Sequence, residues 1–264
     1  MSCSVVVATS GRRPRQLDAL RAALAAQQEP PGGFEVVVVE DASRRGPSAA
    51  RNEGLARAAG ELVAFTDDDC VPEAGWLVAL HRRWAGRDGL GVGGTVVNAL
   101  RDDRFATASQ LVHDAAHRWA NRLVTRFFSS NNLALPRAAL LELGGFDERL
   151  RYSEDRELCD RWVSAGLRLE HEPAAVVCHA HRMRAPGFLA QHLGYGTGAW
   201  RFRVAQAAAG RPRAPIEPAF YDRLARDAAR APASVAALVA AAQLANAVGF
   251  ASAALADRGR LARL

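Results

Sequence analysis

The sequence contains no lysine, and all 34 of its basic residues are arginine. The formal net charge is +6 and the pI is about 9.9, a balance that is compatible with an anionic partner. Aromatic residues are also few, at 7%, and no arginine run is interleaved with them as single-strand nucleic-acid binders require. We therefore expect no nucleic-acid partner, but a solvated arginine surface that suits phosphate-bearing substrates or anionic lipid.

Cysteine is scarce as well. The four cysteines lie far apart and show no CxxC spacing, so neither a disulfide framework nor a zinc knuckle is indicated. Residues 4–7 already have the pattern of a core strand, and we expect no secretory leader ahead of them. The expected compartment is the reducing cytoplasm.

Charge is absent from one long C-terminal stretch, residues 233–256. Its length would permit a membrane span, but it is mostly alanine, so its transfer free energy is weak. A helix that packs on the rest of the chain, or on a second copy in a homodimer, is the favoured interpretation. Peripheral contact with a membrane is the alternative, and it would make the cytoplasmic protein membrane-associated.

What the sequence does contain is an alternation of β-branched runs with stretches of helical period. This alternation predicts an α/β fold with a mostly parallel sheet sandwiched by helices, whose ligands bind beyond the carboxyl ends of the strands. We expect this domain to cover residues 1–185 and a helical C-terminal extension to cover residues 186–264. The expected strands are residues 4–8, 35–39, 62–65, 90–97, 127–135 and 174–179, and the expected helices are residues 14–27, 47–59, 72–85, 105–123, 136–143 and 155–165.

Three adjacent carboxylates, Asp67, Asp68 and Asp69, directly follow one of the predicted strands. Neighbouring carboxylates repel one another, and a bound divalent cation is the simplest reason to keep them together. Mg²⁺ and Mn²⁺ take oxygen ligands and share them with substrate phosphates. The alternative is a solvated acidic turn, or an N-cap for a helix beginning at Pro72. The position at a strand's carboxyl end favours the cation.

Three further polar clusters occupy ends of expected elements. Glu40-Asp41 closes a strand, where it could bind a ribose or simply stabilise a turn. Glu154-Asp155 opens a helix, where one carboxylate could act as a general base or the pair could stabilise the helix N-terminus. His179 and His181 leave the last strand. We expect alternation to send these two imidazoles to opposite faces, so that at most one joins Asp69 at a cation.

Taken together, these residues resemble the glycosyltransferases of family 2, which have the GT-A fold. Six motifs agree in order, spacing and residue type over roughly residues 2–185. The resemblance implies a nucleotide-sugar-binding catalytic domain and an inverting, metal-assisted, single transfer of a sugar to an acceptor hydroxyl, with a UDP-sugar as the first expectation for the donor. The six motifs are Val5–Thr9, Val38–Ser43, Ala50–Gly54, Ala64–Asp69, Leu143–Glu148 and Ser153–Asp155.

The resemblance also implies roles at the nucleotide-sugar. Thr9 and Asp41 match the contacts to base and ribose, and Arg51 matches an arginine that lies against the base or the first phosphate. Asp67 and Asp68 belong to the donor-binding DxD region, with Asp67 nearer the ribose. Residues 131–132, both asparagine, are expected to touch the donor sugar.

At the metal and the acceptor, Asp69 corresponds to the direct ligand of Mn²⁺ or Mg²⁺, with Asp67 at the other end of the motif. His181 or His179 supplies a late histidine ligand, and we favour His181. Asp155 corresponds to the catalytic base, and Glu154 positions the acceptor. The acceptor itself is open: a lipid carrier, a glycan, a peptide or a small natural product.

The sequence departs from the family's pattern in the opening loop at residues 8–12 and in having Glu40-Asp41 where two aspartates are usual. It also lacks the QxxRW motif of processive synthases, which favours a single transfer. One rival is a nucleotidyltransferase, which should carry a glycine-rich loop after the first strand; here that loop has one glycine and two arginines. The other rival is a non-catalytic nucleotide-binding protein of the same fold. The role of residues 186–264 stays open among packing, an acceptor lid, a dimer contact and a membrane contact.

Overall fold

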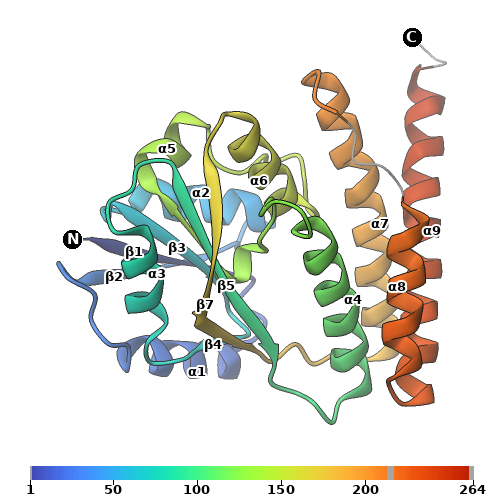
Figure 1. Ribbon diagram of the computed structural model, residues 1–264, viewed down its shortest axis with the longest axis horizontal. Coiled ribbons are helices and arrows are strands. Elements are labelled where there is room, and N and C mark those ends of the chain that lie inside the picture. The colour runs from blue at the N-terminus through green and yellow to red at the C-terminus, as the bar shows by residue number, and fades with distance from the viewer. Residues whose placement is uncertain (1, 213–216, 262–264) are drawn as a thin grey trace. The chain divides into compact units, whose positions relative to one another are not determined.

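The computed structural model describes residues 2–212 and 217–261 (Figure 1). The chain divides into two compact units. The first, which holds the sheet, comprises residues 1–99, 120–149 and 155–181, and the second, which is helical, comprises residues 100–119, 150–154 and 182–264.

The sheet of the first unit has seven strands in the order β2-β1-β3-β6-β5-β7-β4. The pairs β2-β1, β1-β3 and β5-β7 are parallel, whereas β6 runs antiparallel to β3 and β5, and β4 runs antiparallel to β7. The α/β class is confirmed, and the sheet is mixed. The strands are β1 (Cys3–Thr9), β2 (Phe34–Glu40), β3 (Leu62–Asp67), β4 (Cys70–Pro72), β5 (Leu90–Asn98), β6 (Leu133–Pro136) and β7 (Arg168–His179).

Alternating side chains of the central strands supply two cores, one on each face of the sheet. Leu62 and Ala64 of β3 belong to the core that contains residues of α1 (Pro14–Ala25) and α3 (Trp76–Trp84). Val63 and Phe65 belong to the other core, with residues of α2, α5 and α6. Their bounds are α2 (Pro47–Arg57), α5 (Arg137–Glu142) and α6 (Glu154–Ser164). The continuous apolar runs are therefore buried on both faces, as expected for inner strands.

The region after the acidic turn differs from the expectation. Pro72 does not begin a helix; it ends the short strand β4, and α3 begins only at Trp76. β4 is the last strand in the sheet order, and an edge position tolerates a proline because the missing N–H breaks no ladder between inner strands. The predicted strand at residues 127–135 is also shorter, because a 3₁₀ turn, η1 (Ser130–Asn132), precedes β6.

The second unit contains α4 (Arg104–Ala120), α7 (Ala185–Ala208), α8 (Pro218–Ala229) and α9 (Ala233–Leu261), and their buried side chains form a third core. The helices α7 and α9 lie side by side (Figure 1). Their backbones approach very closely at two glycines: a Cβ at Gly196 would lie 1.9 Å from the carbonyl oxygen of Asn246, and one at Gly249 would lie 2.0 Å from that of Leu193. The expected C-terminal helices are confirmed.

The helix α9 is the one described helix that is long and apolar enough to cross a membrane. Over Ala233–Arg258 its most apolar window has a mean hydropathy of 1.6, and 28% of that window is buried inside the structure.

Candidate active site

The carboxyl ends of three neighbouring strands bring the predicted donor-site residues to one edge of the sheet. Thr9 ends β1 and is in register with Glu40 at the end of β2, while Ala8 is in register with Asp67 at the end of β3. The acidic turn follows, and β4 begins at Cys70. This edge is where ligands of α/β sheets bind.

The first two carboxylates of the turn have separate partners. The hydroxyl of Thr9 donates a hydrogen bond of 2.6 Å to Asp68. The guanidinium of Arg51, whose side chain is almost fully buried, donates one of 2.8 Å to Asp67 and lies 5.5 Å from the ring centroid of Phe146. The planar guanidinium of Arg51 therefore lies near an aromatic ring and pairs its charge with Asp67 at the end of β3.

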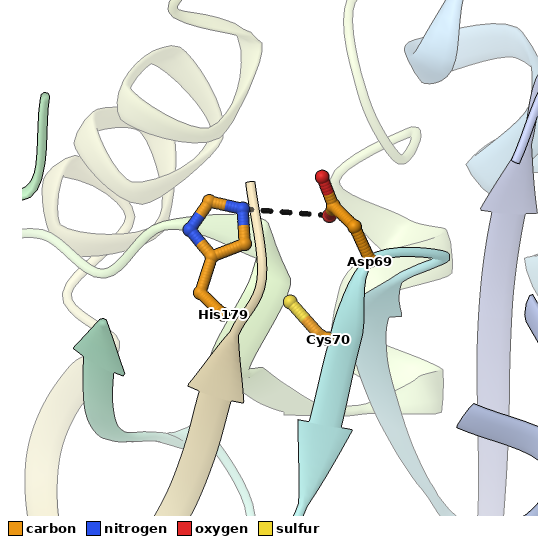
Figure 2. A group of neighbouring side chains, drawn as sticks. All are labelled: Asp69, Cys70 and His179. Atoms are coloured by element: carbon orange, nitrogen blue, oxygen red, sulfur yellow. Dashed lines mark ion pairs between the residues drawn. The ribbon is translucent and has the colours of Figure 1, made fainter. Parts of the chain in front are cut away.

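Asp69 is only 3% exposed, and three basic side chains contact its carboxylate. Its Oδ2 lies 2.7 Å from Nδ1 of His181 and 2.6 Å from a terminal nitrogen of Arg13, and its Oδ1 lies 3.4 Å from Nε2 of His179. Figure 2 shows the imidazole of His179 facing this carboxylate. Burial raises the pKa of Asp69, but the hydrogen bonds from both histidines and the nearby positive charges outweigh it, so the pKa lies well below its ordinary value.

The expectation that at most one histidine reaches this site is wrong. Both His179 and His181 contact Asp69, and their rings stack with centroids 5.2 Å apart. The physical reason is that residues two apart on an extended chain project to the same side, so alternation brings these two imidazoles together.

These side chains fit a divalent cation. A deprotonated carboxylate and two imidazoles are suitable donors for a transition metal such as Mn²⁺. Cys70 is also close, because ligand atoms of Asp69, Cys70 and His179 all lie within 4.8 Å of one another (Figure 2). However, burial raises the pKa of the Cys70 thiol well above its ordinary value, so the thiolate that binds metals is disfavoured there. Cys70 belongs to the apolar core beneath the site.

The candidate base, Asp155, lies at the same edge of the sheet. Its Oδ2 accepts a hydrogen bond of 3.4 Å from the backbone N–H of Ser130 in η1. Leu133, just after η1, pairs with Phe65, two residues before Asp67. Because β6 is antiparallel to β3, η1 and the acidic turn both extend beyond the same end of this strand pair. The carboxylates that the sequence separates by more than 80 positions therefore approach one edge.

The segment that carries the acidic pair has an unusual backbone. Ser153 adopts a φ of 63°, in the left-handed region that a residue with a Cβ seldom occupies. Glu154, which begins α6, is 8% exposed. Strain of this kind persists where the surrounding structure imposes it, and it commonly occurs beside functional groups.

Two predicted donor contacts have other partners. Asp41 accepts hydrogen bonds of 2.8 Å from the backbone N–H groups of Arg45 and Gly46, so it stabilises the turn that leads into α2, which is the alternative that the sequence left open. Asn132 is only 1% exposed, and its amide contacts Trp76 and the carbonyl oxygens of two strands. The expectation that Asn132 touches the donor sugar is therefore wrong, since these bonds hold it in the core.

Sequence reasoning missed two residues of this region, Arg13 and Asn52. Arg13 contacts both Asp68 and Asp69, and the proline that follows it, which begins α1, fixes the loop next to the acidic turn. Asn52 hydrogen-bonds the backbone N–H and C=O of Phe146, at 2.8 and 2.9 Å, and so fixes the double-glycine turn before it. In the sequence, only the two arginines after the first strand pointed to the contact between Arg13 and the acidic turn.

Comparison with known proteins agrees with this geometry. Residues 18–142 match the model of glycosyl transferase family 2. The chain is 32% identical, over 171 residues, to a pre-mycofactocin glycosyltransferase of Mycobacterium tuberculosis, an alignment that covers 62% of this chain and 36% of the relative. It is 29% identical, over 157 residues, to glycosyltransferase AglE of Haloferax volcanii, which covers 55% of this chain and 48% of the relative. The chain thus spans less than half the length of these curated relatives.

Two solved structures are similar in fold. One is mannosyltransferase PcManGT from Pyrobaculum calidifontis in complex with GDP-Man and Mn²⁺, with a TM-score of 0.58 and 22% identity, covering 99% of this chain and 80% of that one. The other is GalNAc-T7 with UDP, GalNAc and Mn²⁺, with a TM-score of 0.53 and 13% identity, covering 85% of this chain and 54% of that one. Residues 18–142 are thus similar in sequence to glycosyl transferase family 2, and the fold of the chain is that of the GT-A glycosyltransferases.

Proposed function

We propose that the protein transfers a sugar from a nucleoside-diphosphate sugar to an acceptor hydroxyl, with inversion at the anomeric carbon and with the help of a divalent cation. One observation carries the proposal: a buried, deprotonated Asp69 with two imidazoles lies at the carboxyl edge of the sheet to which Asp155 also comes. One group of side chains can hold a cation with its diphosphate, and a separate carboxylate is available to take a proton.

In the proposed reaction, a carboxylate oxygen of Asp155 accepts the proton of the acceptor hydroxyl as that oxygen forms a bond to the anomeric carbon. The bond between the anomeric carbon and the diphosphate oxygen breaks, and its electron pair leaves with the nucleoside diphosphate. Attack from the face opposite the leaving group inverts the configuration. A base in this role must come within hydrogen-bond reach of the hydroxyl.

Asp69, His179 and His181 would hold the cation, with Asp67 at the other end of the motif. A bound cation would neutralise the charge that develops on the leaving diphosphate. Because two of the donors are imidazoles, we propose Mn²⁺ over Mg²⁺, which demands oxygen ligands. The two structural neighbours contain Mn²⁺ as well. They hold different nucleotides, GDP and UDP, so UDP is the first nucleotide to test and GDP the second.

The decisive measurement is product analysis with UDP-, GDP- and dTDP-sugars and Mn²⁺, in the parent protein and in Asp155→Asn. The parent should release nucleoside diphosphate, either to water slowly or to a trial acceptor. Asp155→Asn should keep the donor affinity and lose turnover by roughly 10²–10⁴-fold, because the amide cannot accept the proton.

A matched control is Asp222→Asn, whose exposed carboxylate is paired with Arg226 on α8 in the second unit and which should keep the parent's turnover. Release of pyrophosphate by the parent would instead establish a nucleotidyltransferase. Binding of donor without any turnover would establish a non-catalytic nucleotide-binding protein. Undiminished turnover in Asp155→Asn would remove Asp155 from its role as base.

A further inference from the structure

The guanidinium of Arg13 lies where the acidic turn would meet a cation. One of its terminal nitrogens is 2.6 Å from Oδ2 of Asp69 and 3.1 Å from Oδ1 of Asp68. The other is 3.4 Å from Nδ1 of His181. A single side chain therefore contacts two carboxylates of the turn and one of the imidazoles.

These contacts conflict with a bound metal ion. Oδ2 of Asp69 is shared between Arg13 and His181, and its other oxygen faces His179. A cation that used the same oxygen would stand against a positive charge, since guanidinium is protonated at any pH of interest. The carboxylate and the guanidinium must separate before the cation can bind in this place.

Arg13 is able to make this movement. Its side chain is 38% exposed, whereas that of Asp69 is 3% exposed. The residue lies in the loop between β1 and α1, after Gly11 with its φ of 70°. Thus the carboxylate is fixed in the core, and the arginine is the partner that can move toward solvent and toward a ligand at the same edge.

We propose that Arg13 is a counter-ion of the acidic turn that a divalent cation displaces, and that the displaced guanidinium then binds the diphosphate of the donor. Guanidinium groups bind phosphate through paired hydrogen bonds, so the arginine exchanges one anionic partner for another. The inference rests on the proposed function and adds to it an order of events: the cation alone binds weakly, and the cation together with a nucleoside diphosphate binds strongly.

The test measures Mn²⁺ binding by the electron paramagnetic resonance of free Mn²⁺, with and without UDP or GDP, in the parent, Arg13→Ala and Arg13→Gln. Without nucleotide, both variants should bind Mn²⁺ at least about tenfold more tightly than the parent, because the competing charge is gone. With Mn²⁺ present, both should bind the nucleotide more weakly. The parent's coupling between Mn²⁺ and nucleotide, expected in the usual range of roughly 5–150-fold, should shrink accordingly.

The matched control is Arg12→Ala. It removes the same charge one residue away, and its side chain is exposed. If Arg12→Ala raises the affinity for Mn²⁺ as much as Arg13→Ala does, the effect is general electrostatics and the inference is overturned. The inference also fails if the Arg13 variants bind Mn²⁺ no more tightly than the parent.

Folding of the variants is checked by thermal unfolding. A buried carboxylate that has lost its counter-ion should lower the Tm of Arg13→Ala, and Mn²⁺ alone should restore it more than in the parent. Arg13→Gln keeps a hydrogen-bond donor and serves where the alanine variant does not fold. Failure of this inference is distinct from failure of the proposed function: a parent that binds neither Mn²⁺ nor nucleotide contradicts the function, whereas normal binding without an Arg13-specific change contradicts only the exchange.

Discussion

At the scale of single residues, His192 is a buried ionisable group in the second unit. It has no exposed surface, neither ring nitrogen has a hydrogen-bond partner within the described part of the chain, and the rings of Phe188 and Tyr195 lie against it. Burial lowers the pKa of His192 from 6.5 to about 4. The folded protein therefore holds this imidazole neutral at a pH at which the unfolded chain would protonate it.

We predict that stability falls as the pH drops from about 6.5 to about 4. In this window the unfolded state binds a proton that the folded state does not, so the free energy of unfolding decreases with falling pH. Below the folded pKa the full decrease from this group is about 3 kcal/mol. Urea unfolding of the parent and of His192→Leu at pH 8 and pH 5 measures this decrease. His192→Leu should lose less stability on acidification, and equal losses in the two proteins would contradict the assignment.

The residues of the candidate site were largely predictable as types and positions, but their partners were not. The three aspartates and the acidic pair follow strands or open helices in the sequence, and their convergence at one edge follows from strand direction. The contacts that Arg13 makes with Asp69 and His181 depend on a loop conformation that no local pattern specifies. Asn132 shows the opposite case: a polar residue near a predicted site can make its hydrogen bonds within the core instead.

At the scale of elements, α7 supports the loop that precedes the candidate base. Tyr152 lies over two glycines of this helix: a Cβ at Gly194 would lie 2.3 Å from its ring, and one at Gly198 would lie 2.7 Å from its backbone oxygen. We predict that Gly194→Ala costs roughly 1–3 kcal/mol of stability, as overpacking does, and lowers kcat by displacing this loop. Gly187→Ala, on the same helix with nothing within 4 Å of the added methyl group, is the control.

Unfolding and turnover of a double-mutant cycle check this prediction. Tyr152→Ala removes the ring that the new methyl group meets, so the cost of Gly194→Ala should nearly vanish in that background. The cost of Gly198→Ala should persist, because there the methyl group meets backbone atoms of Tyr152. A Gly194→Ala variant as stable and active as Gly187→Ala would mean that α7 does not position the loop.

Elements themselves were predictable where local pattern decides them. The β-branched runs and the prolines at helix starts gave β1, β2, β3, α1 and α2 to within a few residues. Pro72 was misassigned, because a proline favours the first helical turn but is equally tolerated in an edge strand, and only pairing with β7 distinguishes the two. The antiparallel direction of β6 is likewise set by neighbours distant in the sequence, β3 and β5.

At the scale of the whole molecule, a chain with a net charge of +6 carries an apolar stripe on α9. Leu244, Val248 and Leu255 are 67%, 48% and 66% exposed, and their spacing places them on one face of the helix. Weak apolar contact and positive charge add together at an anionic bilayer surface. We predict that the protein sediments with anionic vesicles at low salt, and less so at high salt, where the Debye length is short.

The stripe, rather than charge alone, should decide this binding. Leu244→Glu combined with Leu255→Glu should abolish sedimentation, because burying a carboxylate in the apolar boundary of the bilayer is costly. Leu141→Glu, a 44% exposed leucine on α5, is the matched control and should sediment like the parent. Light scattering distinguishes the other use of such a face: if the parent ignores vesicles and the double variant converts a dimer to a monomer, then the stripe binds a second copy of the chain and the membrane prediction is wrong. The choice between a bilayer and a second copy of the chain therefore rests on these two measurements, because a mean hydropathy of 1.6 over the most apolar window of α9 is compatible with both partners.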